Sequence, residues 1–301
     1  MSDAIEGLPP RMRRLVDEAR KFPPVSVAVV DAGEEHVIEG AREAALAGLI
    51  EPVLIGRRRE IERVMEGLDY PIIETDSEQD AASLGVEQVK EGKASALMKG
   101  WIHTDVLMHP VLANLRTGKR ISHVFVVELA TYHKLLFVTD AAINIAPDLL
   151  AKVSIVQNAV DLARLFGIER PKVAALSAVE QVKPAIFSTI DAACLSKMAE
   201  RGQIRNAVVD GPLAFDNAIS REAALTKNIK SEVSGDVDIL LAPDLDSGNI
   251  LAKDLEYLAG ATMGGIVVGA KVPIMLPSRS DPPSARIVSA AIASLLHHKG
   301  I

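Results

Sequence analysis

Short apolar runs alternate with longer amphipathic segments from one end of the 301-residue chain to the other. The apolar runs predict strands at 25–32, 51–56, 95–100, 123–129, 134–142, 172–179, 207–214, 238–245, 264–270 and 272–278. Helical spacing of apolar residues predicts helices at 37–49, 78–91, 149–166, 180–200, 247–259 and 283–297. The strands are apolar on both faces, which is typical of a sheet covered by helices on both sides. We therefore expect βαβ units, mainly parallel sheets and an α/β fold.

Polar clusters follow several of these strands, and nearly all of them stand at the carboxyl end. They read MKG, TDAA, DGPLAFD, PDLDSGN and PSRSD. Open α/β sheets place their ligand crevice at that edge. Any one such cluster has the composition of an ordinary surface loop, but five of them together predict a cleft.

Composition narrows the class of protein. A length of 301 residues is near the size at which one core gives way to two lobes. Aromatic residues make up 3% and the net charge is -7, which argues against a nucleic-acid-binding surface. The single cysteine, Cys194, excludes an internal disulfide and a multi-thiolate metal site, and it indicates a reducing compartment.

The first residues carry charges and no apolar segment of the secretory type. No apolar run approaches the ~20 residues that span a bilayer. We therefore expect a cytoplasmic protein. GxGxxG after the first strand, GxxxxGK[ST], HExxH, CxxC and GxSxG are all missing from the sequence, which disfavours the usual dinucleotide, kinase, metalloenzyme and hydrolase classes.

The segment VVDGPLAFDNAIS (208–220) predicts a strand that ends at Asp210 and Gly211, with a turn forced by Pro212. A helix is expected to begin near 218. Asp216 or the asparagine after it would either cap this helix or line the cleft, and the sequence leaves both open.

Within PDLDSGNILAK (243–253), Asp246 or Ser247 is expected to cap a helix. Asn249 and Lys253 then share one helix face and would suit a phosphate. The alternative is a solvated face on which Lys253 pairs with a nearby carboxylate.

The segment ALMKGWIHTDVLMHPVLANLRTGKR (96–120) ends a strand at Lys99 and Gly100, and Thr104 or Asp105 is expected to cap the next helix. Its basic turn, with Arg116 and Arg120, either meets an anionic ligand or only solvates a loop.

The fourth motif, VPIMLPSRSDPP (272–283), places a hydroxyl, a guanidinium and a carboxylate after a strand. Arg279 offers a planar fork for phosphate or carboxylate, and Ser278 and Asp281 are close enough in a tight turn to share its pocket. The alternative is a helix start capped by Ser280 or Asp281, with prolines in the first turn.

Taken in order, MKGWIHT, SHVFVVE, TDAAINIAPDL, PKVAALSAVE, VDGPLAFDNAIS, PDLDSGNILAK and VPIMLPSRSD resemble the phosphate acetyltransferase/phosphate butyryltransferase family over nearly the whole chain. LRTGKRISHVFVVE, DNAIS and SRSD are closer to the butyryltransferase branch and to the acyltransferase part of fused enoyl-CoA hydratase/phosphate acetyltransferases. The resemblance implies a two-lobed fold similar to isocitrate and isopropylmalate dehydrogenases, with the active site in the interlobe cleft. It divides the chain into a first lobe of 1–133 plus 260–301 and a second lobe of 134–259.

The implied reaction is acyl-CoA + phosphate ⇌ acyl phosphate + CoA, by direct transfer in a ternary complex with short acyl groups from acetyl to butyryl. The resemblance also implies a homodimer or higher homo-oligomer, with coenzyme A as a substrate and no permanent cofactor or metal. Ser278 would stabilise the oxyanion, Arg279 would bind phosphate and Asp281 is the candidate base. Acetyltransferase members of the family carry their carboxylate farther along the chain, in the segment that reads PPSAR here. They also tend to have an arginine at the position of His109. Candidate substrate-binding residues are Lys99, Gly100, His103, Thr104, Arg116, Arg120, Asp210, Gly211, Pro212, Asp216, Asn249 and Lys253.

Two other hypotheses remain from the sequence. One is an NAD(P)-dependent dehydrogenase on the related two-lobed fold, for which no nucleotide or metal motif is found. The other is a non-catalytic sensor that binds CoA or acyl phosphate.

Overall fold

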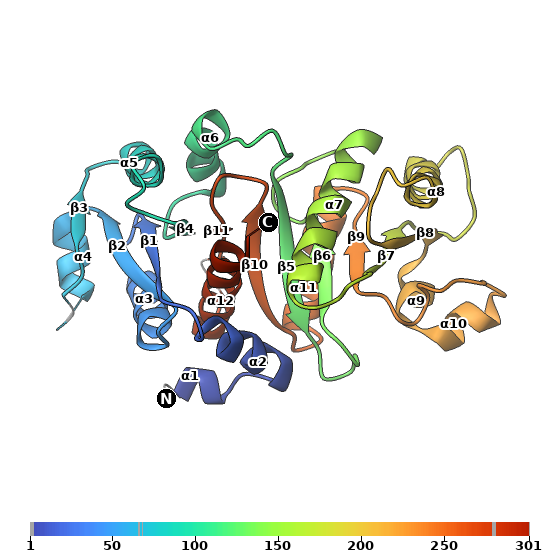
Figure 1. Ribbon diagram of the computed structural model, residues 1–301, viewed down its shortest axis with the longest axis horizontal. Coiled ribbons are helices and arrows are strands. Elements are labelled where there is room, and N and C mark those ends of the chain that lie inside the picture. Colours follow the sequence, from blue (N-terminus) through green and yellow to red (C-terminus); the bar gives the residue numbers. More distant parts are fainter. Residues whose placement is uncertain (1–2, 66, 68, 279–280, 301) are drawn as a thin grey trace. The chain divides into compact units, whose positions relative to one another are not determined.

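The computed structural model describes residues 3–65, 67, 69–278 and 281–300. The chain divides into two compact units. Unit 1 consists of Met1–Ile121 together with Thr262–Gly300, and unit 2 contains Ser122–Ala261. Each unit is an α/β structure with its own run of strands and its own covering helices (Figure 1).

The strands of unit 1 follow the order β3-β2-β1-β4-β11-β10. They are β1 (Val25–Val30), β2 (Ile50–Gly56), β3 (Ile72–Glu74), β4 (Ala96–Lys99), β10 (Thr262–Val268) and β11 (Ile274–Met275). All neighbours are parallel except β10 and β11, which are antiparallel. Consequently β11 ends at the same edge as β4, whereas β10 ends at the opposite one. The buried, mostly apolar strands place the core of the unit around this sheet.

The helices of unit 1 form two packed groups. They are α1 (Asp3–Glu6), α2 (Pro10–Ala19), α3 (Glu35–Leu46), α4 (Arg58–Val64), α5 (Glu78–Lys90), α6 (Thr104–Asn114) and α12 (Pro283–Lys299). The C-terminal helix α12 packs on β10, α2 and α3, whereas α5 packs on β1, β2 and α6 (Figure 1). Because α12 is buried along most of its length, this C-terminal helix is part of the core of unit 1, which also contains the N-terminal residues.

Unit 2 has the strand order β5-β6-β9-β7-β8. The strands are β5 (Ser122–Glu128), β6 (Leu136–Thr139), β7 (Lys172–Leu176), β8 (Val208–Leu213) and β9 (Ile239–Leu241). Only β5 and β6 are antiparallel. The helices are α7 (Leu149–Leu165), α8 (Phe187–Glu200), α9 (Phe215–Ile219), α10 (Arg221–Thr226) and α11 (Leu245–Tyr257).

An ion-pair cluster closes the amino edge of the unit 2 sheet. Asp236 contacts Lys172 Nζ at 2.6 Å, His133 Nε2 at 2.8 Å and Lys134 Nζ at 2.9 Å. Burial alone would raise the pKa of Asp236, but the hydrogen bonds from these three partners outweigh it and hold the pKa well below its usual range. The cluster is therefore a stabilising feature that depends on an ionised carboxylate.

The predicted α/β class with mainly parallel strands is confirmed, and every predicted strand has a counterpart. Several elements are shorter than predicted. The strand expected at 272–278 covers only Ile274–Met275, between two prolines that cannot donate to a ladder. The helix expected at 180–200 begins at Phe187, after Pro184. The pattern missed α2, α4 and β3, which are short or strongly polar.

Candidate functional site

The carboxyl edge of unit 1 brings together residues from two distant motifs. Met275 of β11 pairs in parallel with Met98 of β4, so the residues after these two strands emerge side by side. Lys99 is the last residue of β4 and Gly100 follows it, and Ser278 comes after β11. Lys99 is 6% exposed, so its ammonium lies within the protein at the end of β4.

Gly100 is required by a close approach of two backbones. Its N–H donates to Val30 O at 2.8 Å, and the N–H of Trp101 donates to Asp31 O at 2.9 Å. A Cβ at position 100 would lie 2.2 Å from the same Asp31 oxygen. This contact explains the glycine without any ligand, so a substrate-binding role for Gly100 stays a prediction.

Ser278 and Asp281 form the described part of a tight turn. The Ser278 N–H donates to Asp281 Oδ2 at 2.7 Å, and the Asp281 N–H donates to Ser278 O at 3.2 Å. Arg279 and Ser280 lie outside the described residues. The Asp281 carboxylate is therefore adjacent to the Ser278 backbone, and a pocket shared by the two side chains stays a prediction. The predicted helix cap is wrong for Asp281, because Pro282 occupies the cap position without a side-chain cap and the carboxylate serves the turn instead.

The start of α6 differs from the predicted cap. His103 takes the N-cap position and Thr104 is the first helical residue, and neither Thr104 nor Asp105 makes a side-chain cap. His103 is exposed, and Thr104 is half-buried. Both residues follow β4 and so stand near the carboxyl edge of unit 1.

The basic turn lies at the other edge of unit 1. Arg116 forms a β-bridge with Ala270, and Thr117 Oγ1 donates to Gly269 O at 2.8 Å. Both partners follow β10, which runs antiparallel to β11 and ends at the amino edge of the parallel strands. Arg116 and Arg120 are exposed there, and Arg116 Nε donates to the carbonyl of Leu112. Within unit 1 these cations are not grouped with Ser278.

In unit 2, β8 continues through Pro212 to Leu213, which agrees with the strand predicted at 207–214 and not with a strand end at Asp210 and Gly211. Asp210 Oδ1 accepts from the Gly211 N–H at 2.8 Å. A Cβ on Gly211 would lie 2.8 Å from the oxygen of Ala175, so packing against β7 explains this glycine. A substrate-binding role for these three residues stays a prediction.

Asp216 is committed to an ion pair. Its Oδ2 lies 2.9 Å from Lys227 Nζ, and Glu180 Oε2 lies 3.4 Å from the same nitrogen. The hydrogen bond from Lys227 lowers the pKa of Asp216. Asp216 is not an N-cap, since α9 begins at Phe215 after Ala214 and Ser220 caps α10. The predicted cap at 216 or 217 is therefore wrong.

Helix α11 is capped by Asp244, which accepts from the Ser247 N–H, and not by the predicted Asp246 or Ser247. Asn249 Nδ2 donates to Ala141 O at 3.2 Å. Lys253 Nζ lies 2.7 Å from Glu256 Oε2, which confirms the local pairing that was the alternative to phosphate binding.

Sequence reasoning missed Asp140, although it belongs to the polar cluster TDAA at the end of a predicted strand. Its carboxylate is 3% exposed, and its Oδ1 accepts from the N–H groups of Ala142 and Ile143, both at 2.9 Å. Oδ2 accepts from the Asn144 side chain at 2.6 Å and from the His123 N–H at 3.1 Å. The signal was the TDAAIN cluster, in which an acidic residue is followed by small residues. Asp140 therefore shapes the loop at the carboxyl edge of β6.

A buried lysine was also missed. Lys152 on α7 is 5% exposed, and its Nζ lies 2.6 Å from Asp191 Oδ2 on α8. The amphipathic pattern of α7 gives no sign that a lysine points inward, so the sequence offered no signal for this ion pair.

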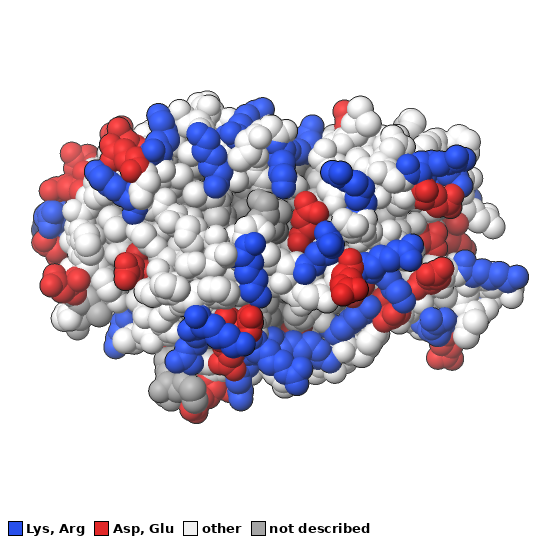
Figure 2. All heavy atoms as spheres, viewed as in Figure 1, with Lys and Arg blue, Asp and Glu red and all other residues white. Residues whose placement is uncertain are grey.

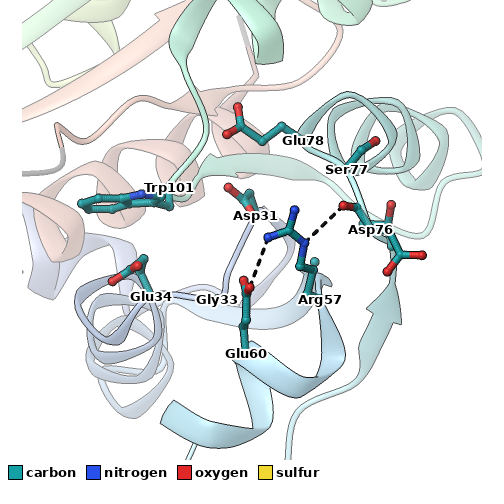
Figure 3. A pocket seen from close by; sticks show the side chains of 11 residues that line it. Asp31, Gly33, Glu34, Arg57, Glu60, Asp76, Ser77, Glu78 and Trp101 are labelled. Carbon is teal, nitrogen blue, oxygen red and sulfur yellow. Dashed lines mark hydrogen bonds and ion pairs between the residues drawn. The ribbon is translucent and has the colours of Figure 1, made fainter.

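A pocket of about 100 Å³ opens at the carboxyl edge of β1, β2 and β3 in unit 1 (Figure 3). Trp101 forms one wall, and Arg57 lies between Glu60 and the backbone of Asp76. The pocket is otherwise acidic, with carboxylates from Asp31, Glu34, Glu60, Asp76 and Glu78. Figure 2 shows acidic side chains gathered over α4, β3 and the start of α5. Because the field of this pocket repels anions, it does not suit the phosphates of a nucleotide.

Among the residues that the structure describes, no group of histidine, cysteine or acidic side chains is arranged to hold a metal ion. Over the same residues, no helix combines the length and apolar character needed to cross a bilayer.

These strand orders and this edge define an α/β protein, and solved phosphotransacylases share its architecture. The crystal structure of a branched-chain phosphotransacylase from Enterococcus faecalis V583 superposes with a TM-score of 0.79 at 32% identity, over 91% of this chain and 99% of that one. A 4-hydroxythreonine-4-phosphate dehydrogenase from Burkholderia phymatum shares the fold alone, with a TM-score of 0.52 at 15% identity, over 91% of this chain and 98% of that one.

The sequence comparisons give the family. The family described as Phosphate acetyl/butaryl transferase matches residues 62–294. A phosphate acetyltransferase of Rickettsia typhi is 50% identical over 285 residues, which cover 92% of this chain and 82% of the relative. A phosphate butyryltransferase of Clostridium acetobutylicum is 43% identical over 278 residues, which cover 90% and 92%. The chain belongs to this transferase family, and the predicted resemblance is confirmed.

Proposed function

We propose that the protein transfers short acyl groups between coenzyme A and phosphate: acyl-CoA + phosphate ⇌ acyl phosphate + CoA. The observation that carries this proposal is the Ser278–Asp281 turn, which follows β11 beside the end of β4 in a chain of the transferase family. Coenzyme A is a substrate here, and no permanently bound cofactor is needed.

In the direction of acyl-CoA formation, the CoA thiol gives its proton to a carboxylate and the thiolate sulfur attacks the acyl phosphate carbonyl. A C–S bond forms, the C–O bond to phosphate breaks, and phosphate leaves. We assign oxyanion stabilisation to the Ser278 hydroxyl and phosphate binding to Arg279. The proton acceptor is Asp281 on this proposal, although its Oδ2 already accepts from the Ser278 N–H.

The remaining assignments rest on the family. Unit 1 and unit 2 would be the two lobes that enclose the substrates, and the active assembly would be a homodimer or larger homo-oligomer in the cytoplasm. Lys99, near the same edge as Ser278, is the cation that the geometry of unit 1 favours for a phosphate group. A phosphate-binding role for Arg116 and Arg120 has less support, because their turn lies at the opposite edge of the unit 1 sheet.

The test is turnover with defined substrates. Purified protein should consume CoA thiol in the presence of acetyl, propionyl or butyryl phosphate, and should release CoA from the matching acyl-CoA only when phosphate or arsenate is added. No turnover with any of the three acyl chains would reject the activity. Arg279→Ala should lose most of the turnover while its melting temperature stays close to wild type, and a near-wild-type rate would reject its role.

A thermal-shift screen separates the other hypotheses. Stabilisation by CoA, and not by NAD or NADP, supports the transferase over a dehydrogenase. Stabilisation by CoA without turnover would instead indicate a sensor that kept the fold.

A further inference from the structure

Arg286 is a buried arginine that holds the turn carrying the proposed acyl-transfer residues. It lies in the first turns of α12 and is 3% exposed. Its Nη1 donates to Asp281 O at 3.0 Å, and its Nη2 donates to Ser278 O at 3.4 Å. One planar guanidinium therefore spans the two carbonyls that stand on either side of Arg279 and Ser280 in the sequence.

Helix α3 leaves room for this side chain. A Cβ at Gly40 would lie 2.0 Å from Arg286 Cδ and 3.0 Å from its Nε. Glycine is disfavoured in the interior of a helix because of its backbone freedom. Its presence in the middle of α3 is explained by the space that the Arg286 side chain needs. The path of the Arg286 stem is thus fixed on one side by α3 and on the other by its own helix.

The charge of Arg286 is not neutralised by an ion pair within the described part of the chain. In that part, both of its hydrogen bonds go to backbone oxygens, and its Nε is buried without a hydrogen-bond partner. Burial lowers the pKa of the guanidinium, with partial compensation from Asp281 and Glu39, but arginine stays protonated in proteins. An inward-facing cation of this kind is costly, so two carbonyl bonds and packing volume alone do not account for an arginine here.

We infer that Arg286 is a positioning residue for acyl transfer, which ties the backbone of Ser278 to that of Asp281 so that the Ser278 hydroxyl and the Asp281 carboxylate meet the substrates in one arrangement. The inference rests on the proposed function, because it assigns Arg286 a task in that same site. Arg286 itself need not touch a substrate. Misplacing a reacting group by ~1 Å can cost ~10²-fold in rate, which sets the scale of the expected effect.

The experiment compares Arg286→Met, Arg286→Lys and Gly40→Ala with wild type. Methionine keeps much of the stem but removes the charge and both donors, lysine keeps the charge without the fork, and Gly40→Ala leaves the guanidinium but displaces its stem. Ile292→Val is the matched control, since Ile292 is also fully buried on α12 but lies away from the turn. Turnover number and KM for phosphate are measured together with amide hydrogen exchange of the peptide that contains 278–285.

We expect Arg286→Met to lower kcat by ~10²-fold, with Arg286→Lys recovering part of the loss and Gly40→Ala falling between them. Exchange at 278–285 should rise in Arg286→Met and Gly40→Ala, and stay at the wild-type rate in Ile292→Val. Wild-type kcat in Arg286→Met, or an equal loss of kcat in Ile292→Val, would overturn the inference. If the wild-type protein shows no acyl transfer, the proposed function is rejected. The hydrogen-exchange result is independent of activity, and unchanged exchange in Arg286→Met would reject the claim that Arg286 fixes the turn.

Discussion

Replacing Gly100 by alanine tests the close approach of β4 to β1 at the carboxyl edge of unit 1. The added methyl carbon would lie 2.2 Å from Asp31 O and 2.5 Å from Val30 O. Both atoms belong to the backbone, so no flexible side chain can move aside. Contacts below 3.0 Å essentially do not occur for a real Cβ, so the segment must retreat by about 0.8 Å.

That retreat breaks the hydrogen bonds that tie the two strands together. The bonds from Gly100 N to Val30 O and from Trp101 N to Asp31 O are 2.8 and 2.9 Å long, and a shift of ~0.8 Å takes both beyond about 3.5 Å. Each buried group left unpaired costs ~1–3 kcal/mol. With partial relaxation, we expect Gly100→Ala to lose about 3 kcal/mol of unfolding free energy, or a melting temperature lower by ~6–12 °C.

Urea denaturation and differential scanning calorimetry measure this loss. Gly48→Ala is the control, because Gly48 has a positive φ of 73° but nothing within 4 Å of its added Cβ. Its cost should be the ~1–2 kcal/mol of the backbone conformation alone. A Gly100→Ala protein as stable as wild type, or no less stable than Gly48→Ala, would refute the clash. A large loss of activity at unchanged stability would show instead that the glycine serves the substrate.

Three further predictions concern the site and its supports. Asp281→Asn keeps an acceptor for the Ser278 N–H but removes the carboxylate, so kcat should fall by ~10²–10⁴-fold if that carboxylate is the base; a wild-type rate would limit Asp281 to holding the turn. Asp236→Asn should cost about 1 kcal/mol at pH 7 after solvent screening. The pKa of Asp236 is depressed in the folded protein, so its contribution to stability is complete above the unfolded pKa of ~3.9 and is lost as the pH falls through the folded pKa. The urea curves of Asp236→Asn and wild type should therefore converge in acid. A stability difference that stays constant with pH would contradict this prediction. Trp101, the single tryptophan, is 37% exposed and forms one wall of the acidic pocket, so saturating CoA should leave its emission unchanged, and a shifted or quenched spectrum would place CoA in that pocket.

The sequence predicted the strands well because buried parallel strands are apolar on both faces, and such runs stand out from the helices around them. It also predicted that Ser278 and Asp281 share one turn, because a separation of three residues with nearby prolines leaves little choice. Element ends were less predictable. Asp244, Asp246 and Ser247 all have the chemistry of a helix cap, and only the backbone shows that Asp244 takes that position.

The position of the basic turn could not be predicted, because it depends on strand direction. Arg116 follows a helix that returns from the carboxyl edge, and its partner strand β10 runs antiparallel to β11. No local pattern encodes that reversal. Arg286 was beyond reach for a related reason. An arginine within an amphipathic helix is normally solvated, and its burial follows from Gly40 on a helix far away in the sequence.

The discontinuous make-up of unit 1 has a consequence for synthesis on the ribosome. Unit 2 is one continuous segment, whereas unit 1 needs Thr262–Gly300, including β10, β11 and the buried helix α12, to complete its sheet and cover α2 and α3. Domains usually fold in the order in which they emerge. The first segment of unit 1 must wait, with the β11 side of β4 unpaired and the α12-facing sides of α2 and α3 uncovered, until the last helix has left the ribosome. The time for which these surfaces of the nascent chain stay exposed is thus set by the number of residues between α6 and β10. Slower translation of unit 2 would lengthen that time.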